Sequence, residues 1–361
     1  YAEKTAKSRG PQGKNCRITR RQVMAAPSDL NEIYLSSSPH YSAKNSSTGV
    51  MAAVIMSLLP LCIYGVYLFG IPALITIITA VCSCVVFELL FQLASKQKIQ
   101  IQDGSAVVSG ILLALVLPPS LPVWMTILGS AFAMIVAKAF FGGIGANVFN
   151  PALTGRAFLF VSFPAAMGTW TLPKNAQPLV EAVTSATGGV TDAVTSATAL
   201  SVLKGADIVK DADTYMNFLL GNRAGCIGES NILLILLAFA FLAVTKIIDW
   251  RAPLAMIATV ALATFLAGGD VVMAMLAGGL IFGAVFMVTD YATSPITTTG
   301  RLIFGAGCGV ITFLIRQFGG YPEGVMFSIL IMNAVVPFLN KLIQKKYGFV
   351  PAPKKTKEAV K

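Results

Sequence analysis

A duplicated stretch of threonine, serine and alanine is the part of the sequence whose residue types and spacing could do chemistry. Residues 181–187 read EAVTSAT and residues 192–198 read DAVTSAT, so seven residues nearly repeat at a spacing of eleven. A threonine hydroxyl can become an ester oxygen of a phosphodiester, and small neighbours such as Ser196 and Ala197 let a bulky nucleotide approach the backbone. The alternative is a Ser/Thr/Ala-rich loop made only for solvation, and composition by itself favours that alternative.

The order of residue types in this stretch resembles the flavinylation motif, in which a transferase moves FMN from FAD onto the final threonine. In the second copy the acceptor is Thr198, and the residues before it that match the motif are Asp192, Thr195, Ser196 and Ala197. The acceptor would be a point of attachment and not a catalytic residue. The match predicts a covalent FMN in this segment.

Thr187, in the first copy, is the alternative acceptor. We prefer Thr198 because the motif carries Asp at its acidic position, where the first copy has Glu, and continues with a Leu two residues beyond the acceptor, here Leu200. Thr187 is followed instead by Gly188 and Gly189, which suit a flexible turn.

The chain is much less charged than a soluble protein. Of its 361 residues, 55% are hydrophobic and only 12% are charged, whereas about a quarter of the residues of a soluble domain are charged. The Lys and Arg residues that give the net charge of +11 lie mainly at the two ends and in short segments between apolar runs. This distribution is typical of membrane topology, so we expect a lipid bilayer as a partner and no nucleic acid.

Cysteine and histidine offer little for metal binding. The six cysteines form no CxxC pair, and a Cys within an apolar run usually behaves as a small apolar residue. His40 is the single histidine, so this chain alone cannot hold a haem between two histidines. We therefore expect no metal site, and a cofactor must be held in another way.

Ten apolar runs approach the roughly 20 residues that a helix needs to cross a bilayer. They predict an all-α integral membrane protein with about ten transmembrane helices, at 50–69, 71–94, 105–117, 123–140, 151–168, 231–248, 252–267, 271–288, 302–315 and 324–340. The runs 105–117 and 302–315 are short. Helix breakers bound them, Pro118 in one case and Pro295 with Gly300 in the other, so we expect half-helices there.

Basic residues predict the orientation, because cytoplasmic segments are rich in Lys and Arg. They cluster before the first span and after the last, so both termini should be cytoplasmic and the long polar insert should lie outside; Arg316, near an outer loop, is an exception. Five spans precede the insert and five follow it, so a structural repeat of the two halves would be an inverted one. The predicted organisation is a basic N-terminal segment, helices one to five, the flavin-bearing insert, helices six to ten and a basic tail, at 1–48, 49–168, 169–230, 231–340 and 341–361.

Three acidic residues are candidates for an ion pathway. Glu88 lies within the second span, where an ionisable group is costly; it could instead reach towards the bilayer surface or pair with a neighbouring subunit. Asp103 and Asp290 lie at cytoplasmic ends of spans, where a carboxylate can receive a cation or cap a helix. For Asp103, which precedes Gly104, we expect capping.

The segment 142–150 is rich in glycine and asparagine. Its amides could face a flavin ring or neighbouring backbone, and we expect close packing to account for most of its glycines. It lacks the Lys and Ser/Thr that accompany the glycines of Walker-type loops, so it is not a loop of that kind.

Seven segments, in order along the chain, resemble the membrane subunits RnfD and NqrB. They are SPHYSAKNSS at 38–47, DGSAVVSGILLALVLPP at 103–119, FGGIGANVFNPALTGR at 141–156, DAVTSATAL at 192–200, GCIGES at 225–230, TDYATSP at 289–295 and YPEG at 321–324. The compact start before the first segment is more similar to RnfD, because NqrB typically has a longer amino-terminal extension. Ala199 departs from the pattern, since a Pro often follows the acceptor threonine.

The resemblance to RnfD implies an electron-carrying subunit of an ion-translocating complex in the cytoplasmic membrane of a bacterium or archaeon. In Rnf complexes electrons pass from reduced ferredoxin to NAD through flavins and iron-sulfur centres, and this flow is coupled to Na⁺ or H⁺ export. The implied partners are the subunits RnfA, RnfB, RnfC, RnfE and RnfG and a flavin transferase, while ferredoxin and NAD would bind other subunits. Relatives also hold a non-covalent riboflavin, which is a second cofactor to test for in this chain.

Two alternatives stay open at the level of sequence. An NqrB-type subunit would serve a sodium-pumping NADH:quinone oxidoreductase. A redox-inactive permease or channel would also have ten spans and broken helices, but it would carry no flavin.

Overall fold

The computed structural model describes residues 47–96, 101–169, 171, 173, 212–221, 225–319 and 324–343. Within these ranges the secondary structure is helical and contains no strand. The predicted all-α class is therefore confirmed for the part of the chain that the structure describes. The duplicated threonine-rich stretch lies outside the described residues.

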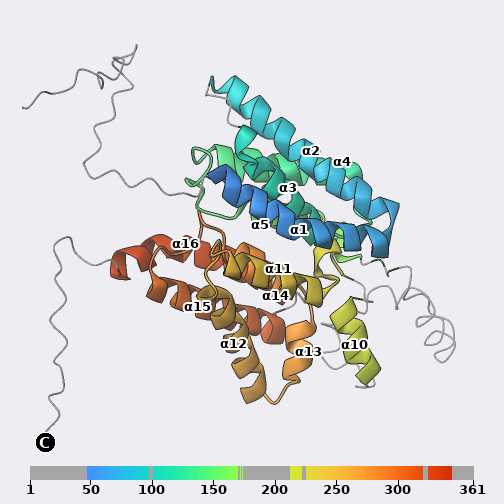
Figure 1. The fold of residues 1–361 in the computed structure, drawn as a ribbon, viewed down its shortest axis with the longest axis vertical. Helices are drawn as coiled ribbons and strands as arrows, with labels where there is room; N and C mark the ends of the chain where they lie inside the picture. Colours follow the sequence, from blue (N-terminus) through green and yellow to red (C-terminus); the bar gives the residue numbers. More distant parts are fainter. Residues whose placement is uncertain are drawn as a thin grey trace, which may run out of the picture. The chain divides into compact units, whose positions relative to one another are not determined.

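Helices before the insert form at the predicted apolar runs (Figure 1). Proline and glycine set several of their ends: α2 follows Gly70, whose φ is 76°, and α3 stops before Pro118 because a proline cannot continue a helix. The elements are α1 (Ser47–Phe69), α2 (Ile71–Ala94), the 3₁₀ turn η2 (Ile101–Asp103), α3 (Ser105–Val116), α4 (Val123–Ala131), the π-helix η3 (Phe132–Ala139), α5 (Pro151–Ser162) and α6 (Pro164–Gly168).

Helices after the duplicated stretch also follow the predicted runs. Asn231 caps α11 and Asp270 caps α13, each by accepting a hydrogen bond from a backbone amide of the first turn. The elements are α10 (Ala212–Leu220), the 3₁₀ turn η5 (Ile227–Glu229), α11 (Ile232–Val244), α12 (Arg251–Leu266), α13 (Val271–Leu276), α14 (Leu280–Phe282), the π-helix η6 (Gly283–Met287), α15 (Thr298–Phe318) and α16 (Val325–Ile343).

Several predicted runs differ from the observed helices. The run 151–168 is not one helix, because it divides into α5 and α6 at Phe163, which precedes Pro164. The run 302–315 is not a half-helix but part of α15, which has 21 residues, because Thr297 caps the helix by accepting a hydrogen bond from the Gly300 amide at 3.1 Å. Gly300 thus lies in the first turn and does not stop the helix. The run 271–288 is interrupted instead, between α13 and α14, where Gly278 has a φ of 64° that glycine tolerates.

Three of the described helices, α1, α2 and α15, are long and apolar enough to cross a membrane. Shorter apolar helices are α3, α4 with η3, α11, α12 and α16. Large apolar side chains are exposed on the outside of these helices, for example Ile63 at 69% and Phe265 at 70%. Apolar surface of this extent requires lipid or protein cover, which agrees with a membrane protein; the number of ten crossings stays a prediction.

Glycines allow the closest contacts between helices. A Cβ at Gly110 of α3 would lie 2.7 Å from the Cα of Val81 in α2, and a Cβ at Gly305 of α15 would lie 2.3 Å from the carbonyl oxygen of Ala252 in α12. Small residues let the backbones of membrane helices approach in this way. The backbones of the pairs α2–α3 and α12–α15, which lie side by side in Figure 1, therefore approach closely at these glycines.

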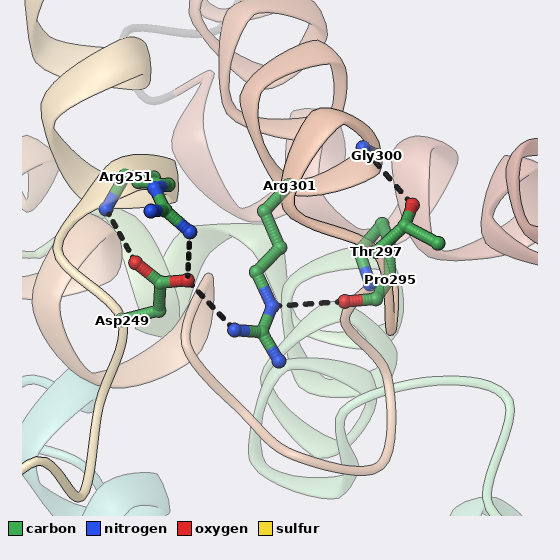
Figure 2. Close-up of polar contacts among 6 residues, drawn as sticks. All are labelled: Asp249, Arg251, Pro295, Thr297, Gly300 and Arg301. Atoms are coloured by element: carbon green, nitrogen blue, oxygen red, sulfur yellow. Dashed lines mark hydrogen bonds and ion pairs between the residues drawn. The ribbon is translucent and has the colours of Figure 1, made fainter. Parts of the chain in front are cut away.

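An ion-pair cluster joins the start of α12 to the start of α15 (Figure 2). Asp249 Oδ2 lies 2.7 Å from Nη1 of Arg301 and 3.5 Å from Nη1 of Arg251, and Arg301 Nε donates to the Pro295 carbonyl at 3.0 Å. Partial burial opposes ionisation of Asp249, but the hydrogen bond from Arg301, together with the Arg251 amide and both positive charges, holds the pKa of this carboxyl below its usual value. The cluster therefore holds the starts of α12 and α15 together.

Candidate functional site

A cavity of about 380 Å³, here named the large cavity, lies among the first helical turns of α3 and α5. A volume of this size is within the range that holds small-molecule cofactors. Its walls are mainly apolar with a few convergent polar groups, and they come from α1, α3, η3, the loop before α5, and the segment between η6 and α15. The polar lining residues are Ser105, Ser109, Lys138, Asn147, Asn150, Thr289, Asp290, Tyr291, Ser294 and Asn340.

Lys138 forms one wall of this cavity and is held by a buried ion pair. Its Nζ lies 2.6 Å from Oε1 of Glu88 and 2.7 Å from Oγ of Ser105. Both charged side chains are more than nine-tenths buried. Lys138 belongs to the π-helix η3, a helix form that often marks functional sites. The pair explains why Glu88 can lie within a predicted span, since its counter-charge is in the same chain and not in a neighbouring subunit.

Asn150 connects the cavity to the start of α5. Its side-chain oxygen caps the helix by accepting hydrogen bonds from the amides of Ala152 and Leu153, at 3.0 and 3.3 Å. Its Nδ2 donates to Oδ2 of Asp290 at 3.4 Å. Pro151 at the first helical position adds a backbone angle already suited to a helix. The cap therefore places an amide and a carboxyl side by side in the cavity wall.

The glycines of 142–150 have a different role from the predicted one. A Cβ at Gly143 or Gly145 would meet no atom within 4 Å, so close packing does not account for them. Their φ angles are 93° and 81°, which other residues rarely adopt. These glycines shape the loop that brings Asn147 to the cavity, where the Asn147 side chain donates to the Phe149 carbonyl at 3.1 Å.

The three predicted acidic residues lie in different surroundings. Asp290 is in the cavity wall and accepts a hydrogen bond from the Thr293 hydroxyl at 3.1 Å. Glu88 is behind the wall, on Lys138. Asp103 lies in the turn η2 and does not cap α3, because Gly104, with φ 72°, occupies the cap position with no side-chain bond. The expected capping role of Asp103 was wrong, since the chain places it one residue too early.

Helix α10 fastens the end of the polar insert to the membrane domain. Tyr215 donates its hydroxyl to Oδ2 of Asp270 at 2.6 Å, while Oδ1 of the same carboxylate caps α13. The Leu220 carbonyl accepts a hydrogen bond from the Tyr64 hydroxyl at 2.8 Å. The bond to Asp270 raises the pKa of Tyr215 above its usual value. Residues 212–220 thus form a short helix that is hydrogen-bonded to α1 and to the start of α13. Thr198, Thr187 and the motif residues between them lie outside the described residues.

Residues 34–348 match the model of the NQR2, RnfD, RnfE family. The chain belongs to this family. It is 43% identical to the D component of the proton-translocating ferredoxin:NAD(+) oxidoreductase complex of Clostridium ljungdahlii, over 88% of this chain and 97% of that protein. It is 40% identical to the D component of the Na(+)-translocating ferredoxin:NAD(+) oxidoreductase complex of Acetobacterium woodii, over 91% of this chain and all of that protein.

A third relative, the D component of the ion-translocating oxidoreductase complex of Stutzerimonas stutzeri, is 38% identical over 84% of this chain and 93% of that protein. The resemblance to RnfD stated from the sequence is therefore confirmed. These relatives are subunits of oxidoreductase complexes. This chain, as a member of the same family, is likewise a subunit of an oxidoreductase complex.

Four charged residues lie in the interior of this family member, and none of them was a candidate site residue in the prediction from sequence. They are Lys138, Arg156, Glu229 and Arg316, each less than a tenth exposed. Arg316 was noted only as an exception to the charge rule, and its burial explains why it does not obey a rule for loops. Lys138 and Arg156 lie within predicted apolar runs, so an ionisable residue inside a span was the signal that could have found them.

Proposed function

We propose that this chain is the electron-carrying RnfD-type membrane subunit of an Rnf-type ferredoxin:NAD oxidoreductase, with FMN esterified to Thr198. The observation that carries the proposal is family membership over residues 34–348 together with the sequence DAVTSAT in the insert. In two of the relatives named above, the complex is described as a ferredoxin:NAD(+) oxidoreductase. When attached, FMN would supply the one- and two-electron chemistry, while the protein holds and positions it.

The anchoring of α10 supports a positioning role for the insert. Thr198 precedes α10 by fourteen residues, a length of chain that spans at most about 50 Å. The Tyr215–Asp270 hydrogen bond fixes the far end of this tether at the start of α13. A cofactor on Thr198 would therefore stay within a bounded distance of the membrane domain, at a high effective concentration next to its electron partners.

The cavity of about 380 Å³ suits a second, non-covalent flavin such as riboflavin. A flavin ring has a polar edge with hydrogen-bond donors and acceptors and an apolar edge. The cavity offers Asn147, Asn150 and Ser105 as polar partners among apolar walls that include Leu112 and Phe286. These residues would bind and orient the ring and exclude water from it.

Coupling to Na⁺ or H⁺ export is part of the proposal for the complex. The similarity to these relatives does not choose between the two ions, because a relative named as proton-translocating and one named as Na(+)-translocating are 43% and 40% identical to this chain. Asp290 and Glu88 are the acidic residues at or behind the cavity, and Asp103 is the third candidate for an ion pathway. Flavin transferase and the subunits RnfA, RnfB, RnfC, RnfE and RnfG are the proposed partners.

Fluorescence of the denatured chain under ultraviolet light tests the acceptor. The complex is produced in cells that have the flavin transferase and separated in a denaturing gel, where only covalent flavin remains. Thr198→Ala should abolish the fluorescence of this chain, whereas the matched change Thr187→Ala should leave it. A dark wild-type chain would favour the permease interpretation, and the reverse pattern would move the acceptor to the first copy.

A further inference from the structure

A second cluster of charged side chains lies in the interior, away from the large cavity. It consists of Arg156 in α5, Glu229 in η5 and Arg316 in α15, which are 5%, 4% and 8% exposed. Together they line a small cavity of about 10 Å³, which is space for one water. Ionisable groups at such positions in membrane proteins are costly and face ion pathways or one another.

The cluster reaches the carbonyl ends of two short helices, directly at α13 and through Cys226 at α3. Arg316 donates from Nη1 to the Ala274 carbonyl at 2.7 Å and from Nη2 to the Ala277 carbonyl at 3.0 Å, where α13 ends. The Cys226 thiol donates to the Val116 carbonyl at 3.0 Å, where α3 ends. Both helix ends therefore point their partial negative charge into the same place.

Arg156 completes the cluster. Its Nη2 donates to Sγ of Cys226 at 3.3 Å, and its Nη1 lies 3.9 Å from Oε1 of Glu229. Two guanidinium groups, which stay protonated in proteins, and one carboxylate thus line the same small cavity. The cluster carries one excess positive charge when Glu229 is ionised and two when it is protonated.

The small cavity lies about one helical turn from the large cavity along three shared parts of the chain. Leu112 lines the large cavity, and Val116, one turn further along α3, lines the small one. The same step of one turn separates Ala152 from Arg156 in α5 and Phe286 from Phe282 at α14 and η6. Val116 lies about 16 Å along α3 from Ser105, at 1.5 Å per residue, which is about half the hydrocarbon thickness of a bilayer.

In transporters, carbonyl ends of broken helices near the middle of the membrane coordinate the transported cation. Here the corresponding place between the ends of α3 and α13 is filled by guanidinium groups of the chain itself. We infer that Arg156 and Arg316 form a fixed positive barrier. This barrier prevents Na⁺ and H⁺ from crossing this subunit between the large cavity and the opposite side of the membrane. The coupling ion of the complex then crosses along another route, and the barrier keeps this subunit from leaking cations. This inference does not depend on either flavin.

A barrier and a purely structural role predict different results when a positive charge and a negative charge of the cluster are removed in turn. The intact complex is reconstituted in lipid vesicles without electron donor, and passive Na⁺ and H⁺ flux is driven by an imposed potential. Arg316→Met removes a positive charge and should raise the flux at least tenfold, which is about 1.4 kcal/mol of barrier. Glu229→Gln removes the carboxylate, leaves both guanidinium groups and should keep the vesicles tight.

Controls make each outcome decisive. Arg316→Lys keeps the charge and should stay tight, and Arg251→Met, at the predicted cytoplasmic end of α12, should also leave the flux unchanged. Size-exclusion chromatography shows whether each variant complex assembles, and Arg156→Met replaces Arg316→Met if the latter does not. Equal leakage from Arg316→Met and Glu229→Gln would overturn the barrier in favour of a structural role. An assembled arginine-to-methionine complex as tight as wild type would overturn it as well.

Discussion

Lys138 shows how a single buried charge is held in this membrane domain. Its ammonium group reaches both Glu88 and Ser105 within 2.7 Å, from a helix that the chain reaches some fifty residues after Glu88. A buried ion pair adds little net stability, but removal of one partner leaves the other charge without compensation. A substitution that removes only Lys138 or only Glu88 should therefore be poorly tolerated in this cavity wall.

Lys138→Met should destabilise the protein by about 3–5 kcal/mol, because Glu88 stays buried without its cation. The double variant Lys138→Met with Glu88→Gln should recover most of that loss. The thermal unfolding midpoints of the two purified complexes in detergent give the comparison. If the double variant is as unstable as the single one, the packing of the lysine stem matters and its charge does not.

Asp249 predicts a dependence of stability on pH. Because Arg301 and Arg251 lower its pKa in the folded state, the carboxylate stabilises the fold at pH values above the unfolded pKa, near 3.9. This contribution to stability is lost as the pH falls from the pKa of the unfolded state through the lower pKa of the folded state. The unfolding midpoint of wild type should therefore exceed that of Asp249→Asn at pH 6, and the difference should shrink below pH 4. A difference that is constant with pH would mean that the ionised carboxylate is not its source.

At the scale of the element, the helices could be predicted because an apolar run of adequate length has few other ways to satisfy its backbone in a membrane. Ends set by proline were also readable, as at Pro118. The interruption of the helix at Gly278 could not be predicted from the sequence, because a Gly-Gly pair inside an apolar run is compatible with a continuous membrane helix. The cap by Thr297 was missed for the related reason that Gly300 looked like a breaker.

The candidate site was less predictable than its helices. The loop 142–150 and Asp290 were identified as candidates from residue type, and both line the large cavity. The partners of buried charges were not predictable, since Glu88 and Lys138 are far apart in sequence and only the packing of α2 on η3 brings them together. The central cluster of Arg156, Glu229 and Arg316 likewise requires three elements to meet.

The contact of α12 with α15 depends on two glycines one turn apart, Gly305 and Gly309. A Cβ at Gly305 would lie 2.3 Å from the Ala252 carbonyl oxygen, so Gly305→Ala must push the two helices apart. We expect a loss of about 1–3 kcal/mol, seen as a lower unfolding midpoint. Gly168→Ala is the matched control, because a Cβ there would meet no atom within 4 Å; equal effects of the two changes would show that close approach is not the reason.

At the scale of the whole molecule, the distribution of Lys and Arg predicts that both termini are cytoplasmic and the insert is outside. A green fluorescent protein fused after residue 361 should fluoresce, because it folds in the cytoplasm. An alkaline phosphatase inserted between Gly188 and Gly189 should be active, because it requires export. An inactive phosphatase in a stably inserted fusion would contradict the orientation, and with it a flavin on the outer face.

An electron-carrying membrane protein must hold a redox group, and the proposed place for it in this chain is the insert. The buried charges, the cavity and the anchored α10 describe a scaffold, and the covalent FMN is what would make that scaffold an electron carrier. Family membership supports this role, and a chemical measurement on the insert can test it without any assay of the complex.

Mass spectrometry of the purified chain is the most direct measurement. Trypsin leaves both threonine candidates in one peptide, residues 175–204, so fragmentation within that peptide must locate the added mass. We predict that the peptide carries the mass of FMN joined with loss of water, and that the fragments place it on Thr198. An unmodified peptide, from cells that contain an active flavin transferase, would contradict the role of this chain as an electron carrier.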